Sequence, residues 1–104
     1  MSSKFRARSG EAPDLAEQLE AAHDRLRLAS KAKSIAEFTW SEKYRQWVRE
    51  HPDHYRGDSE RRKLAAQDAY LTEYTALQSG VQELQDARLA LAAIKDRLVA
   101  KETK

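Results

Sequence analysis

Two histidines and an aspartate lie close together near the middle of the chain, and these residue types could bind a metal ion or transfer protons. His51, Asp53 and His54 place three potential ligands within four residues. Metal sites usually take further ligands from a second segment, and a short turn with none is a poor cage. His23, the remaining histidine, has acidic neighbours but no nucleophile fixed beside it. We therefore expect no enzyme activity, no catalytic or metal site, no cofactor and no small-molecule substrate.

Arginine, lysine and aromatic residues surround these histidines, and this mixture suits phosphate groups and stacked bases. The net charge is only +2, which by itself does not indicate a nucleic-acid partner. Trp40, Tyr44 and Trp47 recur at helical spacing and are expected to pack in a helix contact. The candidate partner-binding residues are Arg45, Arg49, His51, Asp53, His54, Tyr55, Arg56, Arg61, Arg62 and Lys63. Binding of nucleic acid through these residues and a basic N-terminal arm is one alternative function.

The segment His51-Pro52-Asp53, between two predicted helices, resembles the loop of J-domain co-chaperones, which dock on Hsp70-type chaperones. Tyr44-Arg45 before it, Gly57-Asp58 after it and Ala69-Tyr70 in the next helix are similar to that family's pattern. The spacing from the Tyr-Arg pair to the loop differs by one residue, and the second predicted helix is longer than in the family. As a second alternative, the resemblance implies a degenerate co-chaperone that depends on Asp53 to stimulate the chaperone's ATPase.

A long helix is expected to precede the histidine segment. Apolar residues recur at steps of three and four from Leu15 to Trp47, which is typical of a helix that packs along a partner. The pattern predicts a helix over residues 14–50. Two sequences that resemble capping boxes leave a break near 34–40 open.

A turn and a second long helix are expected to follow. Pro52 ends the first helix because proline lacks the N–H that a helix interior needs, and Gly57 suits a turn over 51–58. A second apolar series predicts a helix over 59–100. Residues 14–101 would then form one helical hairpin.

The two helices are expected to pack antiparallel about a centre near Tyr55. This register places Trp40 opposite Tyr70, and Gly80 opposite residues 29–30. Its aliphatic pairs are Leu26 with Leu84 and Leu19 with Leu91. Trp40 should then be largely buried, so Trp40→Ala should cost about 3–5 kcal/mol of unfolding free energy.

A second set of apolar residues lies off this seam and needs cover if it is not simply exposed, as scattered apolar residues often are. These candidate dimer or partner residues are Leu28, Ile35, Phe38, Leu64, Leu71 and Leu89. The predicted fold class is therefore all-α: a long, antiparallel, coiled-coil-like two-helix hairpin, completed as a dimeric four-helix bundle.

The composition agrees with a helical interaction protein. Hydrophobic residues make up 40% and charged residues 35% of the 104 residues, with three Gly, two Pro and no Cys. Residues 1–13 are expected to be a disordered basic arm and 102–104 a frayed tail. No stretch is typical of a signal peptide or a membrane span, so we expect a cytoplasmic protein that does not bind a membrane. The leading hypothesis is a small adaptor or accessory regulatory protein, of the kind found in phages, whose partner is another protein or itself.

Overall fold

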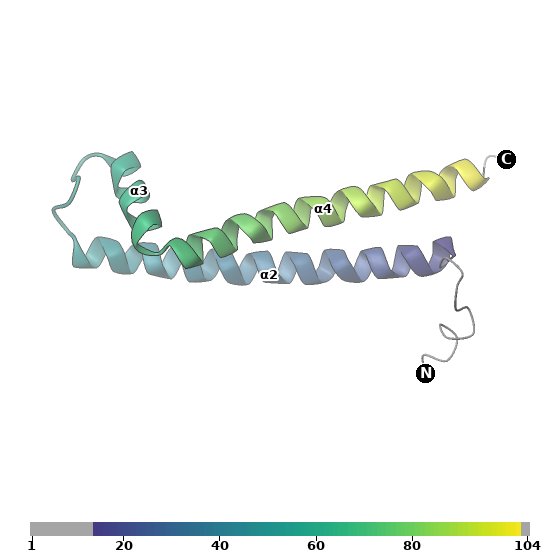
Figure 1. Ribbon diagram of the computed structural model, residues 1–104, viewed down its shortest axis with the longest axis horizontal. Coiled ribbons are helices and arrows are strands. Elements are labelled where there is room, and N and C mark those ends of the chain that lie inside the picture. Colours follow the sequence, from purple (N-terminus) through teal and green to yellow (C-terminus); the bar gives the residue numbers. More distant parts are fainter. Residues whose placement is uncertain (1–13, 103–104) are drawn as a thin grey trace, which may run out of the picture.

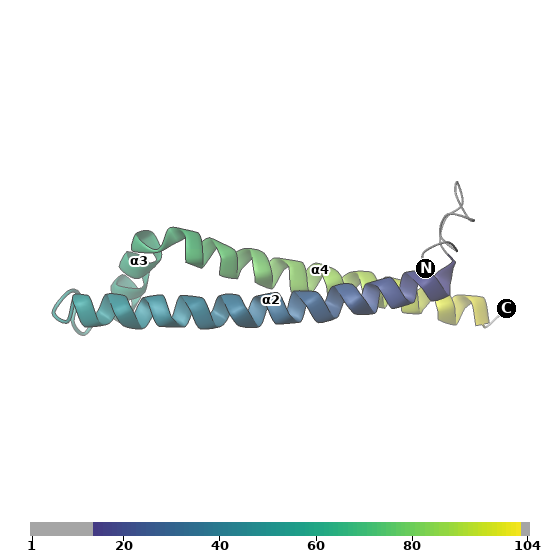
Figure 2. The same cartoon turned by 90° about the horizontal axis from the view of Figure 1, so that it is seen from below.

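A computed structural model describes residues 14–102 and consists of three helices over that range. The helices are α2 (Leu15–Glu50), α3 (Ser59–Ala69) and α4 (Leu71–Glu102). Helices α2 and α4 run side by side in opposite directions, and α3 stands across their closed end (Figures 1 and 2). The all-helical fold and the antiparallel hairpin are thus confirmed. The predicted arm over 1–13 and the last two residues of the predicted tail lie outside the described residues.

Helix α2 begins and ends where the sequence predicts. Asp14 caps it: its carboxylate accepts a hydrogen bond of 2.8 Å from the Glu17 N–H, and its own N–H donates to the Glu17 carboxylate at 3.3 Å. At the other end the His51 N–H donates to the Trp47 carbonyl at 2.9 Å, and Pro52 prevents a further turn. The helix is continuous, so the break considered near 34–40 does not occur.

The second predicted helix is not continuous, and the single helix over 59–100 is wrong. It bends at Tyr70 (φ −122°, ψ 53°), which separates α3 from α4. Two residues of α2 lie beside Tyr70: the Lys43 amine is 5.3 Å from the centre of the Tyr70 ring, and burial together with the Glu50 carboxylate raises the pKa of Tyr70. The bend swings α3 across the end of α2, so packing overrides a helical pattern that the sequence would otherwise continue.

The core between α2 and α4 consists of two adjoining clusters. Ala22, Leu91 and Ile94 form one, and Ala29, Leu84 and Ala87 form the other. Leu19 packs against the cluster that contains Leu91, and Leu26 against the cluster that contains Leu84, as predicted.

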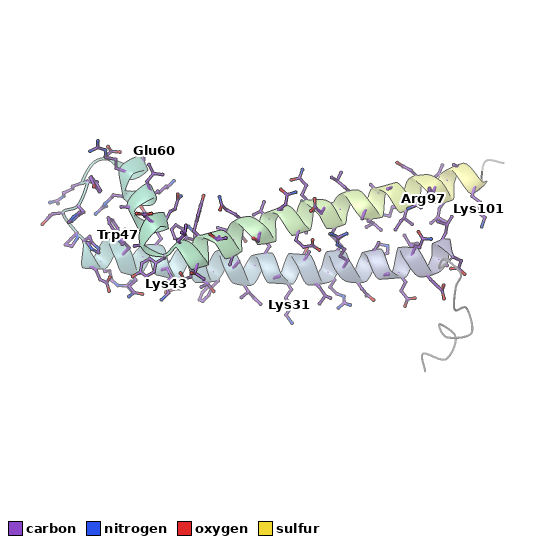
Figure 3. All side chains as sticks on the ribbon, in the orientation of Figure 1. Lys31, Lys43, Trp47, Glu60, Arg97 and Lys101 are labelled. Atoms are coloured by element: carbon purple, nitrogen blue, oxygen red, sulfur yellow. The ribbon has the colours of Figure 1, made fainter. Side chains whose placement is uncertain are left out.

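Near the bend the predicted register is wrong by about one helical turn. The ring of Trp40 lies 5.1 Å from that of Tyr74, not opposite Tyr70, and Trp40 is only half-buried. The shift follows from the bend, because α3 leaves the seam and α4 begins pairing with α2 later in the sequence. The buried tryptophan is Trp47, which lies near α3 (Figure 3).

Gly80 of α4 lies close to the backbone of α2. A Cβ atom built on it would lie 3.3 Å from the Cα of Lys33, so a side chain here would press on the α2 backbone. The prediction placed Gly80 opposite residues 29–30, and the same register shift moves the contact to Lys33. The Lys33 amine turns away from the seam and pairs with the Glu37 carboxylate at 2.9 Å.

Few large side chains are buried in this hairpin. Among the residues that the structure describes, Trp47, Leu84, Leu91 and Ile94 are the large apolar residues that are buried, and the other buried residues are alanines. The large apolar residues that stay exposed are Leu28, Ile35, Phe38, Tyr55, Leu64, Leu71, Val81, Leu89 and Val99. None of the described helices combines the length and the apolar character needed to cross a membrane.

Candidate functional site

The tip of the hairpin, residues 51–58, is an ordered turn. Its backbone closes through hydrogen bonds from the His54 N–H to the His51 carbonyl (3.2 Å) and from the Asp58 N–H to the Tyr55 carbonyl (2.9 Å). Tyr55 and Gly57 have positive φ angles of 52° and 84°. Asp58 then caps α3 by accepting a hydrogen bond of 3.1 Å from the Arg61 N–H. The backbone N–H groups of His54, Asp58 and Arg61 are therefore all hydrogen-bonded within the turn and the first turn of α3.

The aromatic rings of the tip contact one another, while His54 and Tyr55 stay exposed to solvent. The His51 ring stacks on Trp47, with centroids 4.5 Å apart and planes 17° apart. Nδ1 of His51 lies 2.9 Å from the Trp47 carbonyl oxygen, to which it donates when that nitrogen carries the proton. His54 meets the His51 ring edge-on at 5.2 Å. These contacts give His51 a structural role in ending α2.

Arg62 fastens the turn to α3. Its guanidinium donates to the carbonyl oxygens of His54 (3.1 Å) and Pro52 (3.0 Å), so one side chain of α3 holds the first half of the turn. Because two acceptors already hold the guanidinium, it is poorly placed to meet a phosphate. Binding of a partner by Arg62 stays a prediction; within the chain, the residue holds the turn.

Three other predicted tip arginines also have intramolecular contacts. Arg61 lies over the Tyr55 ring at 5.6 Å, Arg45 pairs with Glu42 at 2.9 Å, and Arg56 meets Asp53 at 3.4 Å. Arg49 and Lys63 are exposed at the end of α2 and at the first turns of α3. Some of the basic residues of the tip are therefore paired within the chain, and others are exposed.

Asp53 is the exposed residue of the tip that the J-domain resemblance singles out. Its side chain is 84% exposed, while His51 is packed and hydrogen-bonded. The role of Asp53 in docking on a chaperone stays a prediction. Among the described residues, no three histidine or carboxylate side chains are gathered as a metal site would need.

A long apolar groove follows one flank of the hairpin, where α2 and α4 meet. Its hollow nearer the tip has a volume of about 610 Å³ and is lined by Ala32, Ile35, Ala36, Thr39, Thr72, Glu73, Ala76, Ser79 and Gly80. Its hollow nearer the open end has a volume of about 500 Å³ and is lined by Ala21, Asp24, Arg25, Leu28, Ala29, Ala32 and Glu83. Ala32 belongs to both, so the two hollows are neighbours along α2. We call this surface the flank groove.

An ion pair crosses the flank groove at its open-end hollow. Arg25 Nε and Nη2 donate to the two carboxylate oxygens of Glu83 at 2.7 and 2.9 Å. This bidentate hydrogen bonding lowers the pKa of Glu83 below its ordinary value and raises that of Arg25. The pair ties α2 to α4 at that point.

The structure separates the predicted dimer residues. Leu28 and Ile35 lie in the flank groove, whereas Phe38, Leu71 and Leu89 do not line it. Leu64 lies on α3 in a separate hollow beside Tyr55, Arg61, Ala65 and Asp68. Only part of the predicted face thus forms one surface.

Sequence reasoning missed Ala21, Thr39 and the whole α4 wall of the flank groove. The signal was present as a second series at steps of four and three: Ala21, Arg25, Leu28, Ala32, Ile35 and Thr39. Because this series contains small and charged residues, large apolar side chains alone do not reveal it.

Comparison with known proteins gives no further guidance: no family model, curated protein or solved structure matches this chain.

Proposed function

We propose that this chain is a non-enzymatic helical interaction module that works through protein–protein contacts of its flank groove. The partner surface is the apolar side of one or two helices from another polypeptide. The observation that carries the proposal is the exposure of large apolar side chains in this groove, with Leu28 61% and Ile35 58% exposed. Contiguous exposed apolar surface of this kind marks interaction sites.

The shape of the flank groove suits a helical partner. From Ala21 to Thr39 it follows α2 for about 27 Å at a rise of ~1.5 Å per residue. Its walls carry alanine, threonine, serine and glycine beside Leu28 and Ile35, which leaves room for the side chains of an incoming helix. Four charged residues also line it: Asp24, Arg25, Glu73 and Glu83.

The contacts within the tip favour the flank groove over the tip as the working surface. A nucleic-acid site needs several cations free to meet phosphates, yet Arg45, Arg56, Arg61 and Arg62 are engaged within the chain. The nucleic-acid and J-domain alternatives remain hypotheses that place the working residues at the tip.

Site-specific photo-crosslinking in the cell of origin tests the proposal. A photoreactive residue at Ile35 should form adducts with protein, and one at Arg49 should not. Ala76→Asp, on the opposite wall of the groove, should abolish the Ile35 adducts, while Gln78→Asp, an exposed change that does not line the groove, should leave them. Adducts at Arg49 but not at Ile35 would show that the tip is the working surface and would refute the proposal.

A further inference from the structure

We infer that the partner in the flank groove is a second copy of this chain, packed antiparallel about a two-fold axis close to Ala32. This inference rests on the proposed function and adds the identity and direction of the partner. The resulting dimer would be a four-helix bundle with the two α2 helices in contact at its centre.

The first support is a second heptad-like seam on α2. Ala21, Arg25, Leu28, Ala32, Ile35 and Thr39 follow one another at steps of four, three, four, three and four, and each of them lines the flank groove. Such a stripe is the pattern by which one helix packs along another over several turns. The seam with α4 uses a different stripe, which contains Ala22 and Ala29. Helix α2 therefore carries two packing stripes; α4 fills the first, and of the second Arg25 is paired with Glu83 of α4.

The second support is that the flank groove is self-complementary. Ala32 separates the two hollows, with the exposed Leu28 on one side of it and the exposed Ile35 on the other. A two-fold axis through this point exchanges the hollows. Leu28 of one copy then meets the hollow around Ala36 of the other, and Ile35 meets the hollow around Ala29. One surface patch that fits itself is what a two-fold dimer requires.

The third support is the area that this arrangement buries. Ala32 lies at the midpoint of α2, Leu15–Glu50, so this axis gives the two α2 helices their greatest overlap. The flank groove follows α2 for about 27 Å, which across a flank about 20 Å wide gives roughly 540 Å² on each copy. The total of roughly 1,100 Å² clears the ~1,000 Å² that a specific interface needs. Moving the axis by one heptad would shorten the overlap by about 21 Å.

Single cysteines test the direction and the axis, because the natural chain contains none. Ala21 and Thr39 lie at the two ends of the flank groove, eighteen residues apart, which is about five complete helical turns. With a short bis-maleimide and the full-length chain, Ala32→Cys should give covalent dimers. Ala21→Cys and Thr39→Cys should give none separately, because the two equal positions lie far from the axis, but should crosslink when the two variants are mixed.

Ser34→Cys is the matched control, because Ser34 is exposed, does not line the groove and lies about 100° round the helix from Ile35. It should not crosslink. Crosslinking of Ala21→Cys by itself would show a parallel dimer and overturn the inference. Dimers that crosslink only through Ser34→Cys would overturn the use of the groove as well.

Sedimentation of the wild-type chain separates this inference from the proposed function. A dimer at micromolar concentration that Ile35→Asp makes monomeric, and that Ser34→Asp leaves intact, supports both. A wild-type monomer whose Ile35 photo-adducts contain a different protein overturns the inference of self-association and leaves the proposed function standing.

Discussion

Replacement of Trp47 should damage the closed end of the hairpin more than replacement of any other aromatic residue. Trp47 is 5% exposed, its ring stacks on His51 at 4.5 Å, and His54 meets it edge-on at 6.2 Å. Truncating a buried tryptophan to alanine costs about 3–5 kcal/mol, which includes the cavity left behind. The lost stack accounts for about 0.5–1.5 kcal/mol of this.

The matched comparison is Trp40, which is half-buried and contacts Tyr74 and Tyr44. Because the hydrophobic contribution follows the area removed from water, Trp40→Ala should cost about half as much, roughly 2 kcal/mol. Urea unfolding followed by circular dichroism measures both, at one fixed protein concentration because self-association would shift the midpoint. The unfolding free energy of Trp47→Leu should lie between those of Trp47→Ala and the wild type, and this variant should stay folded enough for the measurement.

A loss of unfolding free energy below about 1 kcal/mol in Trp47→Ala, or one no larger than in Trp40→Ala, would contradict this prediction. Either result would mean that Trp47 is not buried in solution. Faster amide exchange confined to residues 59–69 in Trp47→Leu would instead support the packing, because it would show that α3 depends on this ring.

Three further predictions concern the turn and the ion pair. Gly57→Ala should destabilise the fold by about 1 kcal/mol in urea unfolding. Its φ is 84° and a Cβ would meet no atom within 4 Å, so backbone strain is the only cost. Gly57→Asn should lose less unfolding free energy, and equal losses would contradict this explanation. Arg62→Ala should speed amide exchange at Asp58 several-fold by freeing the Pro52 and His54 carbonyls, whereas Lys63→Ala should not. Nuclear magnetic resonance titration should give Glu83 a pKa below that of an ordinary glutamate, and Arg25→Gln should restore it. Because the pKa of Glu83 is lower in the folded than in the unfolded chain, the ion pair's contribution to stability is complete above the ordinary glutamate pKa. It is lost as the pH falls through the folded pKa. A Glu83 pKa that is the same in Arg25→Gln as in the wild type would refute the pairing.

The sequence predicts the hairpin because local rules determine it. Asp14 and Glu17 form a capping box, Pro52 ends α2, and the apolar steps from Leu15 to Trp47 indicate one packed face. These signals act over a few residues, so a single sequence contains them. The bend at Tyr70 leaves no such local signal, because the residues beside Tyr70, Glu50 and Lys43, come from α2 and not from its own segment.

The candidate site was harder to predict for a related reason. Leu28 and Ile35 are recognisable as apolar residues off the seam, but the groove between them depends on small residues of α4 such as Ala76 and Ser79. Which small residues face Ile35 is decided by the register, and the register is set by the bend. At the tip the error was the opposite one. The sequence indicated arginines free to bind a partner, but Arg62 hydrogen-bonds to the Pro52 and His54 carbonyls.

The closed end of the hairpin also determines the order in which the chain can fold. Arg25 and Glu83 are 58 residues apart in sequence, whereas the turn joins α2 and α3 through residues 51–58 alone. The entropy cost of closing a loop grows with the length of the loop. Once the tip has formed, each further contact along the seam closes only a short additional loop. We expect α2 and α4 to zip from the tip toward the open end. Substitutions near Trp47 should therefore slow folding, and substitutions at Ile94 should chiefly speed unfolding.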